Sequence, residues 1–185
     1  AGCTSADACL WLFRTHLYLC CLCCYWQVRA PASLHVAKPP SQHLRQQQKK
    51  VVFTNGCFDL LHRGHVEYLR QARKLGDVLM VGLNSDASVQ ALKGPNRPLM
   101  SQEDRAAILA ELRSVSYICI FDEPSVEPLV ADLLPDILMK GGDYKPEEIV
   151  GHELVEQAGG VAQSLILQSG CSTSELLHKL RGLQE

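Results

Sequence analysis

The chain has 185 residues, and its 18 Lys and Arg against 20 Asp and Glu give a net charge of −2. This length allows one domain with a full hydrophobic core and an additional segment. The charges offer no basic excess that could neutralise a nucleic-acid backbone, so a nucleic-acid partner is not expected. Any phosphate chemistry must therefore depend on a local cluster of positive groups.

Residues 1–50 differ in composition from the rest of the chain. Six of the nine cysteines lie in the first 24 residues, and an apolar stretch from Ala8 to Val28 is interrupted by Arg14. The prolines and the polar run Ser41 to Lys50 that follow are typical of a linker. We therefore interpret 1–50 as an atypical Cys-rich apolar extension with a polar, Pro-containing linker, and 51–185 as one globular domain.

Three roles for this extension stay open: a dispensable segment, a membrane anchor or targeting peptide, and a metal site. Membrane insertion of Arg14 would cost ~3 kcal/mol, and Cys20-Cys21-x-Cys23-Cys24 lacks the gaps of common zinc sites. Membrane contact is expected only if the extension anchors the chain. The other cysteines (Cys57, Cys119, Cys171) are expected as small buried residues of a reducing compartment, which favours the cytoplasm for the globular domain.

From residue 51 onward, apolar runs alternate with stretches of helical periodicity. The predicted strands are 51–54, 78–83, 117–121, 137–139 and 161–167. The predicted helices are 65–75, 86–92, 102–113, 125–134, 147–158 and 173–182, with capping patterns at Ser101 and Ser172. This alternation predicts a single α/β domain with a doubly wound parallel sheet covered on both faces. Ligands of such sheets bind outside the carboxyl ends of the strands, where the strand order reverses.

The most informative motif follows the first predicted strand. His62 and His65, separated by Arg63 and Gly64, lie where that strand leads into a helix. A helix N-terminus has unpaired N–H groups and a partial positive charge, so it attracts phosphate. Two histidines can add donors to the same anion, and Gly56 and Gly64 allow the backbone to approach it closely. The pattern predicts a site for a nucleoside triphosphate.

Five ordered motifs extend this reading: TNGCFDLLHRGH (54–65), LNSD (83–86), LKGPNRP (92–98), KGGDYKP (140–146) and GCSTS (170–174). Together they resemble the cytidylyltransferase-like nucleotidyltransferase superfamily with its HxGH motif and Rossmann-like fold. Within it, the chain most resembles the heptose branch, D-glycero-β-D-manno-heptose 1-phosphate adenylyltransferase of bacterial ADP-heptose and lipopolysaccharide synthesis. Many relatives carry an arginine where this chain has Leu176, which favours the heptose branch and leaves Lys179 and Arg181 as substitutes.

The resemblance implies a Mg²⁺-dependent transfer from ATP to a sugar 1-phosphate, which gives a nucleotide sugar and pyrophosphate. In the bifunctional relatives a sugar kinase domain precedes this one, so a separate sugar kinase is expected if the chain is complete. A homo-oligomer is possible. Two alternatives stay open: a CTP-dependent cytidylyltransferase acting on glycerol 3-phosphate or a phospho-alcohol, and a non-catalytic nucleotide-binding module tethered by residues 1–50.

By the same resemblance, site residues fall into three groups, with Mg²⁺ arriving with the triphosphate and no protein metal ligand. The catalytic group is His62, His65 and Lys93. The nucleotide-binding group is Asn55, Gly56, Cys57, Phe58, Gly64, Arg105, Lys140, Gly141, Ser172 and Thr173. The substrate-binding group is Asp59, Arg97, Gly142, Asp143 and Tyr144.

Several of these residues also have structural readings that stay open. The histidines could simply be satisfied groups at a helix start, and Phe58 is expected to pack under the turn. Asp59 either helps to place Mg²⁺ or the acceptor, or caps the turn. Lys93 and Arg97 either reach phosphate or are solvated surface charges. Arg105, in the first turn of a helix, either meets an anion or forms a salt bridge. The loop beginning at Lys140 could be a simple tight turn.

Overall fold

The computed structural model describes residues 41–166 and Thr173. Their centre is a sheet of five parallel strands in the order β3-β2-β1-β4-β5. The strands are β1 (Val51–Gly56), β2 (Val78–Asn84), β3 (Tyr117–Phe121), β4 (Ile137–Gly141) and β5 (Val161–Leu165). From β1 the chain proceeds to β2 and β3 on one side, and it returns to β4 and β5 on the other. The predicted doubly wound parallel sheet is therefore confirmed, with its switch point between β1 and β4.

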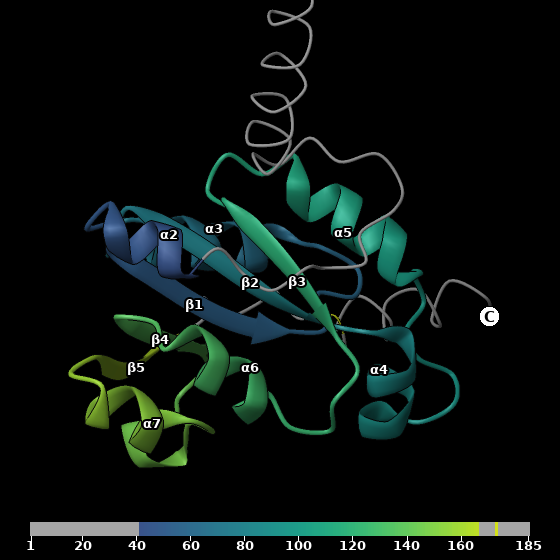
Figure 1. Ribbon diagram of the computed structural model, residues 1–185. Helices are drawn as coiled ribbons and strands as arrows, with labels where there is room; N and C mark the ends of the chain where they lie inside the picture. Colours follow the sequence, from purple (N-terminus) through teal and green to yellow (C-terminus); the bar gives the residue numbers. More distant parts are fainter. Residues whose placement is uncertain (1–40, 167–172, 174–185) are drawn as a thin grey trace, which may run out of the picture.

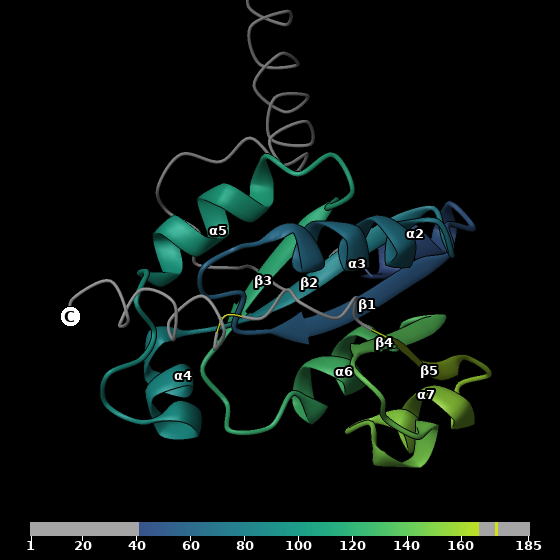
Figure 2. The same ribbon diagram turned by 180° about the vertical axis from the view of Figure 1, so that it is seen from behind.

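Helices cover both faces of this sheet (Figures 1 and 2). They are α2 (Ser41–Gln46), α3 (Arg63–Arg73), α4 (Asp86–Lys93), α5 (Gln102–Ala110), α6 (Glu127–Leu133), the 3₁₀ turn η1 (Pro146–Glu148) and α7 (His152–Gln157). The helix predicted over 147–158 is thus two shorter pieces. Gly151 lies between them at a φ of 91°, a left-handed conformation that a continuous right-handed helix does not contain. The helix predicted at 173–182 lies outside the described residues, apart from Thr173.

Two hydrophobic clusters form because successive side chains of a strand point to opposite faces. Phe53 of β1 packs with residues of α2, α6 and α7 in one cluster. Its neighbour Val52 packs with residues of α3 and α5 in the other. Figure 1 shows α3 and α5 on one side of the sheet and α6 and α7 on the other. Because helices cover both faces of the sheet, the strands are continuous apolar runs in the sequence.

Residues before β1 differ from the linker expected over 41–50. They begin with α2, whose Leu44 is only 4% exposed and belongs to the first cluster. The Arg45 guanidinium donates to the carbonyls of Leu133 (3.1 Å) and Leu134 (2.8 Å). These carbonyls end α6 and lack partners within the helix. The folded unit therefore includes α2. This helix was not predicted, because the segment 41–50 is mostly polar.

Two local features frame the site. Ser101 caps α5 as predicted, since its side chain accepts from the Asp104 N–H at 3.1 Å. In Figure 1, α4 lies beside the carboxyl end of the sheet, where it precedes the 94–100 loop. Within the described residues, no helix is both long and apolar enough to cross a membrane.

Candidate active site

A cavity of about 600 Å³ lies at the carboxyl ends of the strands. The predicted site residues that line it come from the β1–α3 turn, α3, α4, the end of β4 and the segment beyond β5. They are Asn55, Gly56, Cys57, Phe58, Asp59, His65, Lys93, Lys140, Gly141, Tyr144 and Thr173. Segments more than 100 residues apart in sequence, such as Asn55 and Thr173, thus meet around one space. Its size suits a small-molecule ligand.

The two histidines of the motif form a stacked pair at the start of α3. Their ring centroids are 3.9 Å apart, with 27° between the ring planes. His62 is the N-cap residue, and its Nδ1 accepts from the Gly64 N–H at 3.1 Å. The Nδ1 of His65 accepts from the His62 N–H at 3.4 Å. In a neutral ring the proton must then be on Nε2, so both rings keep an Nε2–H donor for a ligand.

Both histidines are neutral at neutral pH. Burial lowers the pKa of His65 to about 4, with smaller contributions from the charges of His62 and Lys93. Burial also lowers the pKa of His62. His65 lines the cavity. His62 stacks against the ring of His65 and does not line the cavity. The pair therefore presents neutral hydrogen-bond donors rather than imidazolium charges.

The turn between β1 and α3 is tightly folded around these rings. Phe58 and Leu60 have φ angles of 47° and 53°, a left-handed conformation that is unfavourable for residues with a Cβ. The Phe58 ring packs over Gly56, where an added Cβ would lie 3.1 Å from it, and its centroid is 5.4 Å from that of His65. Phe58 therefore packs under the turn, as expected. Gly64 is buried in the first turn of α3.

Asp59 holds the turn to the 94–100 loop. Its side chain is 1% exposed and accepts from the Leu99 N–H (3.1 and 3.0 Å) and the Met100 N–H (3.1 Å). Its backbone carbonyl accepts from the Thr173 hydroxyl at 3.0 Å. The turn-capping alternative is therefore correct in this structure. That Asp59 helps to place Mg²⁺ or the acceptor stays a prediction, since the residue also lines the cavity.

Arg97 is also committed to this arrangement. Its Nη2 lies 2.8 Å from Asp59 Oδ2, and its side chain is 16% exposed. The buried Nε has no hydrogen-bond partner among the described residues. Arg97 does not line the cavity. The solvated surface charge is therefore wrong for Arg97, because its guanidinium pairs with Asp59, whereas the phosphate clamp stays a prediction.

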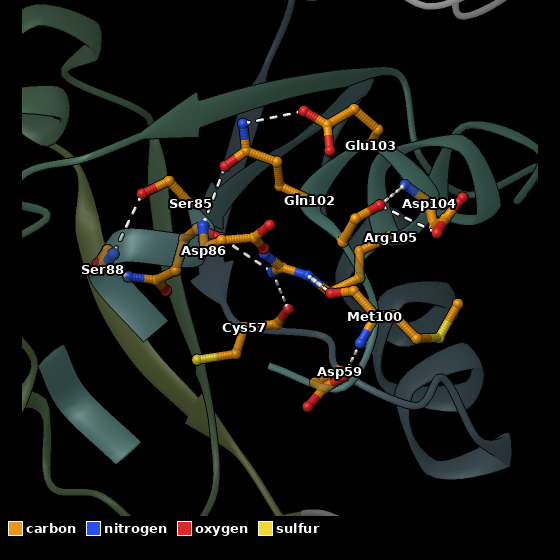
Figure 3. Close-up of polar contacts among 12 residues, drawn as sticks. Cys57, Asp59, Ser85, Asp86, Ser88, Met100, Gln102, Glu103, Asp104 and Arg105 are labelled. Atoms are coloured by element: carbon orange, nitrogen blue, oxygen red, sulfur yellow. Dashed lines mark hydrogen bonds and ion pairs between the residues drawn. The ribbon is translucent and has the colours of Figure 1, made fainter. Parts of the chain in front are cut away.

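Arg105 joins three loops at the carboxyl edge of the sheet (Figure 3). Its guanidinium donates to the carbonyls of Cys57 (2.6 Å), Asn84 (2.9 Å) and Met100 (3.1 Å) and to Asp86 Oδ1 (2.7 Å). The residue is 1% exposed. The prediction that Arg105 contacts nucleotide is therefore corrected in favour of the salt bridge. A cation in the first turn of α5 interacts unfavourably with the helix dipole. The hydrogen bonds of Arg105 to buried carbonyls and to a carboxylate compensate for this cost.

Two lysines supply positive charge to the cavity. Lys140 follows the buried part of β4, and its Nζ donates to Asn55 Oδ1 at 3.2 Å. Burial lowers its pKa, while the nearby Cys57 thiol acts weakly in the opposite direction. Lys93 is exposed at the end of α4 and close enough to depress the pKa of His65. The solvated side chain of Lys93 still lines the cavity.

The loop after β4 places only some of its predicted residues at the cavity. Tyr144 lines it together with Lys140 and Gly141, but the exposed Asp143 and the left-handed Gly142 (φ 134°) do not. Gly142 instead supports the Tyr144 ring, because a Cβ there would lie 2.6 Å from Cε2 of the tyrosine. The loop is therefore more than a simple turn, although its acidic residue does not face the ligand space.

Sequence reasoning missed one wall of the cavity. Phe121, Pro124, Ser125 and Val126 of the β3–α6 loop line it, as does Leu92. The rule that ligands lie at the carboxyl ends of strands could have indicated the β3–α6 loop. The four lining residues of this segment carry no charge or motif that would attract notice. Ser172 lies outside the described residues.

Among the described residues, no group of three or more His, Cys, Asp or Glu side chains is placed to hold a metal ion. Asp59 is the carboxylate nearest to the double-histidine turn in sequence, and its oxygens are occupied by Arg97 and two backbone N–H groups. What the site offers is neutral imidazoles, lysines and backbone donors, which suit an anionic ligand.

A doubly wound sheet with donors gathered at its switch point defines the class of α/β nucleotide-binding enzymes. The chain belongs to the Cytidylyltransferase-like family, whose family model matches residues 53–176. It is a nucleotidyltransferase.

Curated relatives support this family assignment. The chain is 54% identical over 136 residues to the "Bifunctional protein HldE" of Syntrophotalea carbinolica, covering 74% of this chain and 28% of the relative. It is 51% identical over 138 residues to the protein of the same name from Photobacterium profundum, covering 75% and 29%. The chain therefore spans less than a third of the length of these relatives.

A solved structure is similar in fold. The "lipopolysaccharide core biosynthesis protein" of Thermoplasma volcanium superposes with a TM-score of 0.52 at 28% identity, covering 65% of this chain and 97% of that one.

Proposed function

We propose that this chain transfers the adenylyl group of ATP to a sugar 1-phosphate, with heptose 1-phosphate as the acceptor. The heptose branch is supported by the five ordered motifs and by the identity of 51–54% to the proteins named HldE. ATP and the acceptor would bind in the cavity at the carboxyl edge. The observation that carries the proposal is the stacked pair of neutral histidines at the start of α3.

The proposed reaction needs no strong general base. An oxygen of the acceptor phosphate, already ionised, attacks the α-phosphorus of ATP. The new P–O bond forms as the bond from the α-phosphorus to the oxygen bridging to the β-phosphate breaks, and pyrophosphate leaves with that electron pair. Catalysis then consists of positioning and of stabilising negative charge in the transition state.

The side chains at the cavity are suited to that task. His65 lines the cavity and keeps Nε2–H as a neutral donor, because its Nδ1 accepts from the His62 N–H and its ring stacks on that of His62. Lys93 and Lys140 add positive charge, and within the part of the chain that the structure describes neither forms an ion pair with a carboxylate. Fixed donors of this kind cost little reorganisation when charge develops.

Mg²⁺ is proposed to enter with the triphosphate. The described residues do not supply a metal-binding cluster, and no catalytic step is assigned to a protein-held ion. The ion would neutralise triphosphate charge, while this chain binds and orients the two substrates.

The test is a screen of ATP, CTP, GTP and UTP against heptose 1-phosphate, hexose 1-phosphates and glycerol 3-phosphate, with pyrophosphate release as the readout. The proposal expects turnover with ATP and heptose 1-phosphate and an ADP-sugar product by mass. Turnover with CTP and glycerol 3-phosphate alone would overturn the adenylyl assignment while leaving the nucleotidyltransferase class intact.

A further inference from the structure

One wall of the cavity carries an aromatic ring whose surface is open. Among the described residues, four phenyl or phenol rings line the cavity. Phe58, Tyr68 and Phe121 are 7%, 6% and 5% exposed, so they lie within the hydrophobic core. Tyr144 is 43% exposed. Of these four rings, Tyr144 is therefore the one that can offer a face to a planar ligand.

This ring is held in place in the structure as it stands. On one side it lies against Gly142, where a Cβ would approach Cε2 to 2.6 Å. The Gly142 N–H donates to the Leu165 carbonyl at 2.9 Å. The Tyr144 carbonyl accepts from the Ser164 hydroxyl at 2.8 Å. The loop backbone is thus attached to β5 and the ring packs against Gly142, so the backbone that carries the ring needs little ordering when a ligand binds.

The surroundings indicate which part of a ligand would lie here. The same loop supplies Lys140, whose charge suits phosphate, and only three residues separate it from Tyr144. Val150, 53% exposed, also lines the cavity and adds apolar surface. A nucleotide has a flat apolar base at one end and phosphates at the other, whereas a phosphorylated sugar has hydroxyls that require polar partners.

We infer that Tyr144 is the stacking platform for the base of the bound nucleotide, rather than a contact to the acceptor sugar. This inference rests on the proposed function only in that the cavity binds a nucleoside triphosphate. Stacking uses the face of the base, so it contributes affinity without distinguishing adenine from cytosine. Base selection would then come from groups at the edge of the base.

The test compares wild type, Tyr144→Phe and Tyr144→Leu by equilibrium binding of ATP, CTP and inorganic tripolyphosphate. Tyr144→Leu is expected to weaken binding of the preferred nucleotide by roughly five- to a hundred-fold, the range for loss of one base–aromatic stack. Tyr144→Phe should bind within about two-fold of wild type, because it keeps the ring. Tripolyphosphate, which has no base, should bind all three proteins equally.

A second pair of variants distinguishes displacement of the Tyr144 ring from the effect of backbone strain alone. Gly142→Ala introduces a Cβ at a φ of 134° and against the ring, whereas Gly159→Ala introduces one at a φ of 86° with no atom within 4 Å. Gly142→Ala should weaken nucleotide but not tripolyphosphate binding, and Gly159→Ala should affect neither. Upfield shifts of the base protons in the complex should disappear in Tyr144→Leu.

Three outcomes overturn the inference: unchanged nucleotide affinity in Tyr144→Leu, equal loss of tripolyphosphate affinity, or a rise confined to the KM of the sugar phosphate. Absence of binding by any nucleotide to wild type would overturn it as well. By contrast, a stacking effect seen with CTP instead of ATP would support the platform and contradict only the adenylyl assignment.

Discussion

The carboxylate of Asp59 and the guanidinium of Arg97 form a buried ion pair, with 2.8 Å between Oδ2 and Nη2. The pair joins the β1–α3 turn, which carries the double histidine, to the loop that follows Lys93. The backbone carbonyl of Asp59 also accepts from Thr173. Three segments at the cavity are therefore joined through Asp59.

Removing either member of the pair should destabilise the fold. Asp59→Ala leaves the Arg97 charge and the N–H groups of Leu99 and Met100 unpaired, so we expect a loss of about 3–5 kcal/mol. Arg97→Met should cost less, because those two N–H groups still stabilise the carboxylate. Urea unfolding of both single variants and the double variant measures the coupling. Strictly additive free energies of unfolding would mean that the pair contributes no coupling energy.

Arg105 should behave as a structural residue. Arg105→Lys cannot reach the Cys57, Asn84 and Met100 carbonyls and Asp86 at once, because a lysine has a single nitrogen. We expect the free energy of unfolding to fall by about 2–4 kcal/mol, since several buried acceptors lose their donor. Tripolyphosphate binding at a temperature where the variant is folded should change little. A large selective loss of tripolyphosphate affinity with unchanged stability would restore Arg105 as a phosphate contact.

His65 should titrate far below an ordinary histidine, near pH 4. Because the pKa is lowered in the folded state, the unfolded chain takes up a proton first as the pH falls. Stability should therefore be unaffected by His65 above about pH 6.5 and decline between about 6.5 and 4. NMR titration of the His65 ring measures the pKa directly. His65→Gln should show a shallower acid decline than wild type, and an identical decline would assign the effect to other groups.

The helix before β1 should be part of the stable domain. Leu44 is 4% exposed, so Leu44→Ala should cost about 2–5 kcal/mol by leaving a cavity in the core. Leu92→Ala is the matched control for stability, because Leu92 is 59% exposed and should change it by less than about 0.5 kcal/mol. Equal stability of the two variants would show that residues 41–50 act as a linker after all.

The sheet and its switch point could be predicted from sequence because parallel strands buried on both faces read as continuous apolar runs. The alternation of Val52 and Phe53 between two cores follows from the period of a strand. Leu44 could not be recognised in the same way, since one apolar residue among polar ones carries no periodicity. Its burial depends on the α6 end that Arg45 caps, which is distant in sequence.

The candidate site likewise contains features that local sequence predicts and features that depend on contacts between distant segments. The place of His62 at the start of α3 follows from local sequence, whereas the packing of Tyr144 against Gly142 was not predicted. The roles of charged side chains were harder to predict. Arg97 and Arg105 are of a residue type that commonly binds phosphate, but in the structure they contact carboxylates and carbonyls. Which partner a cation meets depends on how loops from different strands converge, and no local pattern encodes that.

We expect a neutral Nε2–H donor of His65 to stabilise the transition state of nucleotidyl transfer. Pyrophosphate release by His65→Gln, whose amide can reach the position of Nε2, and by His65→Asn, whose amide mimics Nδ1, tests it most directly. We expect kcat to fall by at least about 100-fold in His65→Asn, since losing one such donor costs ~3 kcal/mol, with His65→Gln retaining considerably more activity. Equal activity of both variants, or a His65→Asn enzyme close to wild type, would contradict the claim.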